Sequence, residues 1–201
     1  MSKCRLLSKA ELDAARFDGD DERLQTLYGL NIEPNAVVAT NGHYLIRVPA
    51  VDLDSEQFPA VDGMKGEAPE APVSISAESA LDTLKGLKKS TLPILQCAAL
   101  TQTPEGLQLI TTDLETPRVS LTKPLDRTFP AYEGVMPKDP PTLQTAFDAK
   151  YLKTICEYAI KHGGRVPSLK MDFTDAQSPV KITITLDDGR EALVVLMPMK
   201  R

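Results

Sequence analysis

The sequence has no long apolar run and few cysteines, and each shortage excludes a class of protein. No segment approaches the roughly 18 uninterrupted apolar residues of a membrane-spanning helix. Residues 1–5 also lack the apolar run of a secretory signal. Cys4, Cys97 and Cys156 are scattered, without the spacing of a metal site or a redox motif. We therefore expect a cytoplasmic protein with reduced, mostly buried thiols, no metal site and no membrane partner.

Catalytic motifs are missing as well. There is no glycine-rich phosphate-binding loop and no nucleophile motif, and the two histidines, His43 and His162, are far apart in sequence. The acidic residues at 18–22 lack the spacing of an EF-hand, so a solvated loop or a helix start explains them better. We expect a protein that is not an enzyme and needs no cofactor.

The composition that is present indicates an ordinary globular protein. The 201 residues are 42% hydrophobic and 25% charged, which is enough for one large or two small cores. The net charge of -5 argues against nonspecific coating of nucleic acid, although it leaves a locally basic surface possible.

One pattern of elements occurs three times along the chain. Each copy has a short strand, a helix cap, an amphipathic helix and then several strands separated by turns. The predicted caps are Ser8, Ser76 and Asp148, and their spacing of about 70 residues suits a βαβββ module. The first cap forms a capping box with Glu11.

The patterns predict the following elements. The helices cover residues 9–16, 77–88 and 149–162. The strands cover residues 27–32, 36–39, 44–48, 73–75, 95–101, 107–111, 118–121, 143–147, 169–173, 180–186 and 191–197. The buried helix stripes are predicted as Ala80, Leu81, Leu84 and Leu87, and as Leu152, Ile155, Cys156, Ala159 and Ile160.

Three remaining segments have their own character. Residues 52–70 are rich in proline, glycine and acids and are predicted to form an exposed loop. Residues 129–141 contain four prolines and are predicted to form an extended connector. Residues 193–199 read Leu-Val-Val-Leu-Met-Pro-Met, so we expect a docked strand whose final Met-Pro-Met is held against another part of the protein.

Three motifs, in the right order, resemble the bacterial sliding clamp, the β subunit of DNA polymerase III. Residues 39–45, Ala-Thr-Asn-Gly-His-Tyr-Leu, resemble the family signature Ala-Thr-Asp-Gly-His-Arg-Leu. Residues 129–137 resemble its Phe-Pro-x-Tyr-x-x-Val-x-Pro connector, and residues 194–200 resemble its Val-Val-Met-Pro-Met-Arg terminus. The resemblance spans nearly the whole chain. It implies an α+β DNA-clamp fold of repeated βαβββ modules, with helices lining a ring and sheets outside.

The chain departs from the family in the number of modules. A family subunit has six modules in three domains, and two subunits close a ring of twelve. Here the resemblance implies a complete clamp domain at 1–128, made of modules 1–50 and 71–128, an interdomain connector at 129–141, and a third module, or half domain, at 142–201. The half before Asp148 is missing. Twelve modules would need four chains, so we expect a homotetramer, with other ring sizes or an open assembly as alternatives.

Single residues also depart from the family pattern. Tyr44 stands where the signature has arginine, Asn41 replaces an aspartate, and Glu133-Gly134 occupies positions where arginine is often found. These changes leave the ligand preference open.

The resemblance implies that the ring helices present basic residues to DNA phosphates without reading sequence. The residues expected to face DNA are Lys85, Lys88, Lys89, Lys150, Lys153, Lys161 and Arg165. Both helix faces also carry acidic residues, so a solvated surface with i,i+4 charge pairs is the alternative interpretation.

The resemblance further implies a hydrophobic groove that binds short peptides from the polymerase, the clamp loader and repair proteins. Carried over onto this sequence, its residues are Leu27, Thr40, Gly42, His43, Tyr44, Leu45, Pro130, Val135, Val195, Leu196, Met197, Pro198 and Met199. Methionine suits a site that serves several peptides, because its thioether repacks around different side chains. For the valine and leucine positions, a place in the strand core is the alternative.

We therefore expect a DNA sliding clamp, a polymerase processivity factor that encircles duplex DNA and tethers a polymerase through the peptide pocket. Its expected partners are double-stranded DNA, a DNA polymerase, a clamp loader and further copies of itself. The shortened subunit suggests an origin in a phage or mobile element. The alternative is a clamp-derived adaptor or decoy that binds peptides without encircling DNA.

Overall fold

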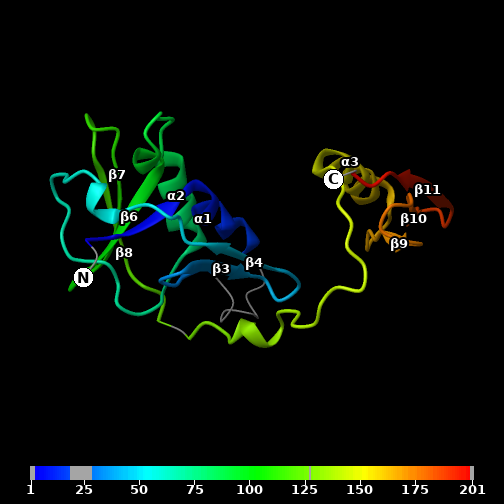
Figure 1. Ribbon diagram of the computed structural model, residues 1–201, viewed down its shortest axis with the longest axis horizontal. Coiled ribbons are helices and arrows are strands. Elements are labelled where there is room, and N and C mark those ends of the chain that lie inside the picture. The colour runs from blue at the N-terminus through cyan, green and yellow to red at the C-terminus, as the bar shows by residue number, and fades with distance from the viewer. Residues whose placement is uncertain (1–2, 19–28, 127, 200–201) are drawn as a thin grey trace. The chain divides into compact units, whose positions relative to one another are not determined.

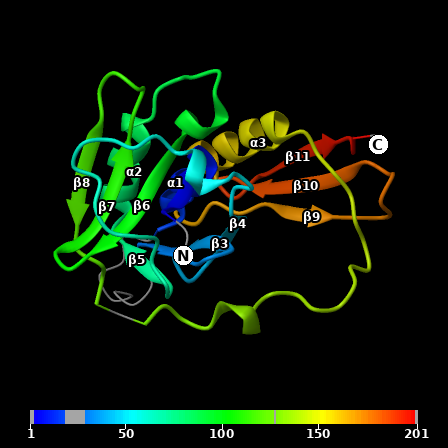
Figure 2. The same ribbon diagram turned by 60° about the vertical axis from the view of Figure 1, so that its left-hand side comes forward.

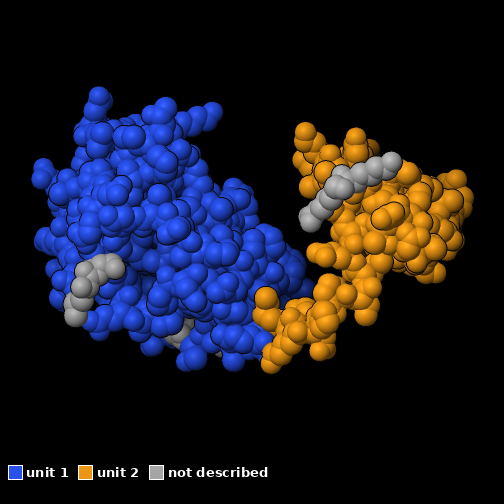
Figure 3. All heavy atoms as spheres, viewed as in Figure 1, with its two compact units in different colours: residues 1–134 blue, residues 135–201 orange. Residues whose placement is uncertain are grey.

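The computed structural model of the chain describes residues 3–18, 29–126 and 128–199. Figure 1 shows the order of the elements, and the chain divides into two compact units, Met1–Gly134 and Val135–Arg201 (Figure 3). We describe each unit by itself. Among the described residues, no helix is both long and apolar enough to cross a membrane.

In its described residues, unit 1 contains two α-helices and two four-stranded sheets. The helices are α1 (Lys9–Asp13) and α2 (Ala77–Gly86). The strands are β1 (Arg5–Ser8), β2 (Leu30–Ile32), β3 (Ala36–Thr40), β4 (Leu45–Pro49), β5 (Val73–Ile75), β6 (Cys97–Thr103), β7 (Gly106–Thr111) and β8 (Arg118–Thr122). Short 3₁₀ helices cover Ala14–Phe17, Ser55–Gln57, Pro93–Gln96 and Tyr132–Gly134.

The two modules of unit 1 exchange their first strands. The sheet orders are β1-β6-β7-β8 and β4-β3-β2-β5. Each three-stranded meander therefore takes its fourth strand from the segment that precedes the helix of the other module. In the register of these pairs, Leu7 lies opposite Ala98, and Ile75 lies opposite Leu30. The exchange is reciprocal, so neither module completes its sheet alone.

All three predicted helix caps are confirmed. The Ser8 Oγ accepts a hydrogen bond from the Glu11 amide at 3.3 Å, and the Ser76 Oγ accepts one from the Ser79 amide at 3.1 Å. The predicted capping box is also present, because the Glu11 carboxylate accepts from the Ser8 amide at 2.9 Å. Each bond satisfies an amide that the first helical turn leaves without a partner.

The sheet formed by β1, β6, β7 and β8 is covered on both faces. On one face, Leu7, Ala98 and Leu109 pack into a core shared with α1 and α2, which lie side by side (Figure 1). On the other face, the fully buried Phe58 packs against Ile110. The prediction of an exposed loop at 52–70 is therefore wrong in part. Apolar residues spaced irregularly along it, Leu53, Val61 and Met64, pack against the sheet.

The helix ends in unit 1 differ slightly from the prediction. The first helix becomes a 3₁₀ helix after Asp13, and α2 ends at Gly86 because Leu87 is extended. Lys88 and Lys89 therefore follow α2 instead of ending it. The strand boundaries move by one to three residues, and the predicted strand residues 27 and 28 lie outside the described part of the chain.

Unit 2 contains one helix and three strands within its described residues. They are α3 (Ala149–His162), β9 (Lys170–Asp172), β10 (Val180–Thr185) and β11 (Glu191–Leu196), and the sheet order is β11-β10-β9. The third predicted cap is present, since the Asp148 carboxylate accepts from the Lys150 amide at 2.8 Å. The helix lies across one face of the sheet (Figure 2).

Two predictions for unit 2 are wrong. The segment predicted as a strand at 143–147 is extended but pairs with no described strand. Ile160, predicted to face the core, is 69% exposed, and the helix residue that is fully packed is Ala159. The prediction follows from the apolar character of isoleucine. Position 160 lies one residue beyond the packed stripe of Leu152, Ile155 and Ala159, so its side chain points to another face of the helix.

Candidate functional site

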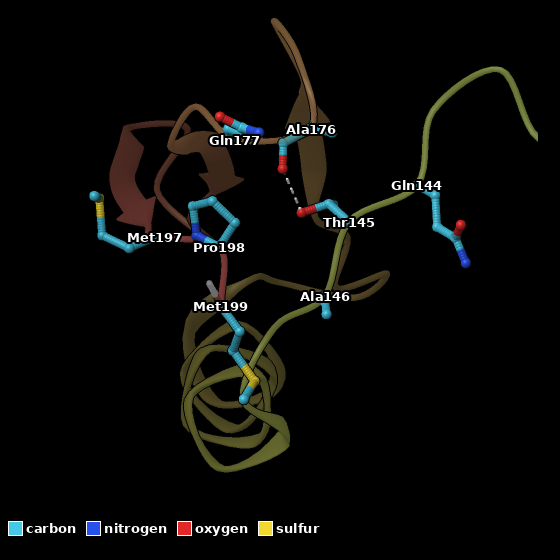
Figure 4. Close-up of a pocket in the computed structure, with 8 residues that line it drawn as sticks. All are labelled: Gln144, Thr145, Ala146, Ala176, Gln177, Met197, Pro198 and Met199. Carbon is cyan, nitrogen blue, oxygen red and sulfur yellow. Dashed lines mark hydrogen bonds between the residues drawn. The ribbon is translucent and has the colours of Figure 1, made fainter. Parts of the chain in front are cut away.

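A cavity of about 560 Å³ opens in unit 2 beside the C-terminal segment (Figure 4). It is lined by Gln144, Thr145, Ala146, Ala176, Gln177, Met197, Pro198 and Met199. Two hydrogen bonds fix its walls. The Met199 amide donates to the Ala146 carbonyl at 2.8 Å, and the Thr145 hydroxyl donates to the Ala176 carbonyl at 3.0 Å.

The methionines give the cavity an apolar wall with adaptable shape. Met197 is 65% exposed and Met199 is 54% exposed, although both are large apolar residues. Flexible thioethers beside a rigid proline, together with the polar residues Gln144 and Gln177 in the lining, suit a short peptide that carries apolar side chains.

The predicted pocket residues of the last strand divide between two environments. Met197, Pro198 and Met199 line the cavity. Val195 is exposed and points to the face of the sheet away from α3, whereas Leu196 is buried in the core of unit 2. Because side chains alternate along a strand, only one of these two neighbours can face the core.

The residues that the sequence did not indicate come from two polar segments. Gln144, Thr145 and Ala146 precede the cap of α3, and Ala176 and Gln177 lie in the turn after β9. Asp175 is a residue type that favours turns, and it is a sequence signal for this segment. In the structure its carboxylate accepts from the amides of the second and third residues after it, each at 2.7 Å.

The predicted signature residues form a tight turn between β3 and β4 in unit 1. The Thr40 hydroxyl donates to the Tyr44 carbonyl at 2.7 Å and accepts from the Gly42 amide at 3.1 Å. Asn41, the replacement for the family aspartate, accepts from the amides of His43 and Tyr44 at 3.0 and 3.2 Å. Gly42 has a φ of 85°, a conformation that favours glycine. The turn is therefore rigid before any ligand binds.

Two side chains of this turn are presented to solvent. His43 is exposed, and the exposed Tyr44 packs edge to face on Phe17 with ring centroids 5.1 Å apart. Leu45 is partly buried at the start of β4. Leu27, also predicted for the pocket, lies outside the described residues.

The connector is fixed to unit 1 through Tyr132. The ring is buried, and its hydroxyl donates to the Glu33 carboxylate at 3.0 Å. Burial raises the pKa of Tyr132. Pro130 is partly buried beside it and lines a second cavity of about 740 Å³ in unit 1. Val135, the next predicted pocket residue, is 76% exposed.

The predicted DNA-facing lysines of unit 1 are mostly paired. Lys85 lies 2.8 Å from the Asp82 carboxylate, and Lys88 lies 2.7 Å from that of Asp113. The Lys88 hydrogen bond, with help from the Thr116 amide, lowers the pKa of Asp113 to about 2. Lys89 is exposed, and no ion pair joins it to a described residue.

The predicted DNA-facing cations of unit 2 form fewer ion pairs. Lys153 lies 3.6 Å from the Glu157 carboxylate, one helical turn away. Lys150, Lys161 and Arg165 are exposed, and none of them forms an ion pair with another residue in the described part of the chain. Helix α3 is therefore a better candidate than α2 for contact with an anionic partner.

Comparison with solved structures identifies the fold. The DNA polymerase β subunit of Streptococcus pyogenes matches with a TM-score of 0.67 at 12% identity, over 100% of this chain and 51% of that one. The Pseudomonas aeruginosa sliding clamp bound to griselimycin matches with 0.69 at 16%, over 98% and 50%. The Thermotoga maritima β subunit matches with 0.64 at 16%, over 100% and 52%.

The chain thus has the α+β fold of the bacterial sliding clamp and spans about half the length of these clamp subunits. No protein-family model matches the sequence, and comparison with curated proteins finds no relative. At this level of identity the likeness establishes the fold alone.

Proposed function

We propose that the chain is a subunit of a DNA sliding clamp, a non-enzymatic processivity factor that encircles duplex DNA and tethers a polymerase. The observation that carries the proposal is the clamp fold itself, with two strand-exchanged modules in unit 1 and one further module in unit 2. Three modules in each chain favour a homotetramer, because four chains supply the twelve modules of a clamp ring.

The cavity in unit 2 supports the tethering role. The cavity beside Met197 and Met199 has an apolar wall, a rigid proline and the polar side chains of Gln144 and Gln177 in its lining. We assign it to a short peptide of the polymerase or the clamp loader. We also propose peptide contacts at the signature turn of unit 1, through the exposed His43 and Tyr44 with Leu45 and Pro130, and at Val135 of unit 2.

The exposed cations of α3 support the DNA role. Lys150 and Lys161 form no ion pair with another described residue, so both ammonium groups are available to a phosphate. A single chain with a net charge of -5 would hold DNA weakly. A ring repeats the same patch around one duplex. Because a closed ring cannot leave circular DNA, it would stay bound although each contact is weak.

Retention on DNA of different topology tests the proposal. The chain is assembled in the presence of nicked circular duplex DNA, separated from free protein at moderate salt, and the DNA is then cut once. We expect protein to stay with the circle and to leave the linear form. Equal retention on both forms would favour the peptide-binding adaptor instead.

A charge-reversal variant tests the assigned helix. Lys150→Glu with Lys161→Glu should lower the salt dependence of DNA binding, by roughly one unit of slope for each phosphate that the variant no longer neutralises. The matched control is Lys181→Glu, an exposed lysine on the face of the sheet away from α3. Because the control reverses one charge and the test variant reverses two, a control effect of half the size or more would mean that only net charge matters.

A further inference from the structure

Within its described residues, the module in unit 2 lacks a strand that both modules of unit 1 possess. In unit 1, the meander β2-β3-β4 is completed by β5, and the meander β6-β7-β8 is completed by β1. In the described part of unit 2, the meander β9-β10-β11 has no fourth strand. The segment 145–147, which stands where β1 and β5 stand relative to their helices, has no strand partner either among the described residues.

The segment 145–147 is already held as β5 is held. The strand β5 ends directly before its cap Ser76, and 147 is the residue directly before the cap Asp148. The Ser74 carbonyl accepts from the amide of Leu125, the third residue after β8, at 2.8 Å. The Ala146 carbonyl likewise accepts from the amide of Met199, the third residue after β11, at 2.8 Å.

One side of this segment therefore matches β5, while the other side is open. The carbonyl of Ala146 points toward Met199, so the peptide groups of Thr145 and Phe147 point the opposite way, as in any extended chain. No backbone hydrogen bond among the described residues engages those groups. The outer side of β9 is open in the same sense, because β10 is its one strand partner in the described chain.

We propose that two copies of this chain complete each other by reciprocal strand exchange. Residues 145–147 of each copy add as an antiparallel fourth strand to β9 of the other. The occupant is a second copy because unit 1 shows the same exchange between two modules of one chain. Each module then both gives and receives a strand, which makes the contact a self-complementary, two-fold interface.

The register follows from β5 and β2. There Ile75, the last residue before the cap, lies opposite Leu30, and both point into the core. The equivalent pairing sets Phe147 opposite Leu169 and Ala146 opposite Lys170. Phe147, Leu169 and Met171 all pack against the core of their own unit, so this register keeps these three apolar side chains on the buried face.

The modest core of unit 2 agrees with a missing half. In α3, only Ala159 is buried among the described residues, and the apolar Leu152, Ile155 and Cys156 are only partly buried. In unit 1, by contrast, both helices and both sheets contribute to one buried cluster. A second copy would add the helix and the strand that complete such a core.

This interface deepens the proposed ring by naming the surface that joins two chains. A pair joined in this way holds six modules, and two pairs hold twelve. The inference rests on the clamp fold and on the strand exchange seen within unit 1. Its test involves no DNA. A joined pair that fails to stay on circular DNA would overturn the ring but not the exchange.

Cysteine cross-linking tests the register directly. In a Cys156→Ser background, one chain carries Ala146→Cys and a differently tagged chain carries Lys170→Cys. The two are co-expressed and oxidised. Directly opposed residues of antiparallel strands lie within disulfide reach. We expect a covalent heterodimer from the pair and no cross-link from either variant alone.

The matched control pairs Ala146→Cys with Asp172→Cys, two positions off register, and should cross-link far less. Equal cross-linking of both pairs, cross-linking of Lys170→Cys chains with each other, or no heterodimer at all would each overturn the proposal.

A proline variant tests the exchange by a second route. Thr145→Pro removes the amide that would donate to β9 of the other copy and should reduce the native mass of the assembly. Thr145→Val is the control, because it also loses the hydroxyl bond to Ala176 but keeps the amide. An unchanged mass for the proline variant, or an equal loss in both, would contradict the assigned strand.

Discussion

At the scale of single residues, the core of unit 1 contains one polar group without a partner. The Thr101 hydroxyl is buried, and no hydrogen bond to it exists among the described residues. The substitution Thr101→Val should raise the free energy of unfolding by about 1 kcal/mol, because the desolvated hydroxyl is removed. Urea unfolding measures the change.

The same substitution at Thr112 is the control for Thr101. The Thr112 hydroxyl accepts from the Leu114 amide at 3.0 Å, so Thr112→Val should lower the free energy of unfolding by about 0.5–1.5 kcal/mol. Opposite signs are expected for the two variants. A loss of stability in Thr101→Val comparable to that in Thr112→Val would mean that the Thr101 hydroxyl is satisfied.

The second residue-scale prediction concerns the cavity of unit 2. Met197→Ala with Met199→Ala should weaken binding of a clamp-motif peptide by roughly tenfold or more, because two large apolar side chains are removed from the cavity wall. Both side chains are largely exposed, so the fold should be retained. Fluorescence anisotropy of a labelled peptide gives the affinity, and circular dichroism verifies folding.

Exposed apolar residues outside the cavity provide the control for this pair. Leu193→Ala with Val195→Ala truncates two exposed residues of β11, the strand directly before Met197, and neither residue lines the cavity. These changes should leave peptide affinity unchanged. If both double variants lose affinity equally, the outer face of β11 contributes as much as the cavity does.

At the scale of elements, the start of α1 depends on a buried ion pair. The Arg5 guanidinium lies 2.7 Å from the carboxylate of Glu11, which is fully buried and also completes the capping box. Arg5→Leu leaves that carboxylate without its cation, so we expect unit 1 to lose about 3–5 kcal/mol of stability. Thermal unfolding followed by circular dichroism measures the loss.

The exposed pair of Arg16 and Asp13 is the control at the same helix. Their side chains lie 2.5 Å apart but are largely exposed, so Arg16→Leu should change stability little. A similar loss from both variants would show that α1 depends on general charge rather than on the buried contact of Arg5.

The sequence predicts elements well where local chemistry decides them. The caps at Ser8, Ser76 and Asp148 and the whole of α3 are confirmed, because a side-chain oxygen before an amphipathic run determines where a helix begins. The positions of most strands along the chain are also predicted, whereas the strand order within the sheets is not. Met-Pro-Met is recognised through its resemblance to a clamp motif and lines a cavity, and its role in peptide binding stays a prediction.

The predictions that fail depend on partners distant in sequence. Residues 143–147 have the residue types of a strand, yet no described strand pairs with them. The local pattern does not indicate whether a partner strand is present. Phe58 lies in a stretch with the composition of a loop, but the open face of a sheet buries it. The cavity wall at Ala176 and Gln177 depends equally on tertiary contact.

At the scale of the whole molecule, the number of chains decides what the fold does. The chain has a mass of 21.9 kDa, and native mass spectrometry should give four times that value if twelve modules close a ring. A monomer, or a dimer that stays a dimer at high concentration, would shift the interpretation to a peptide-binding adaptor.

The order in which the assembly dissociates should distinguish its two kinds of interface. Within a pair, strand exchange adds two sets of backbone hydrogen bonds and joins the cores of two incomplete modules. The contacts between pairs would join domains that are already complete. The exchanged interface should therefore be the stronger, because it buries more apolar surface. On dilution, we expect the tetramer to give dimers before monomers, and Thr145→Pro should remove the dimer step. A trimer, or direct passage from tetramer to monomer in the unmodified chain, would contradict two unequal interfaces.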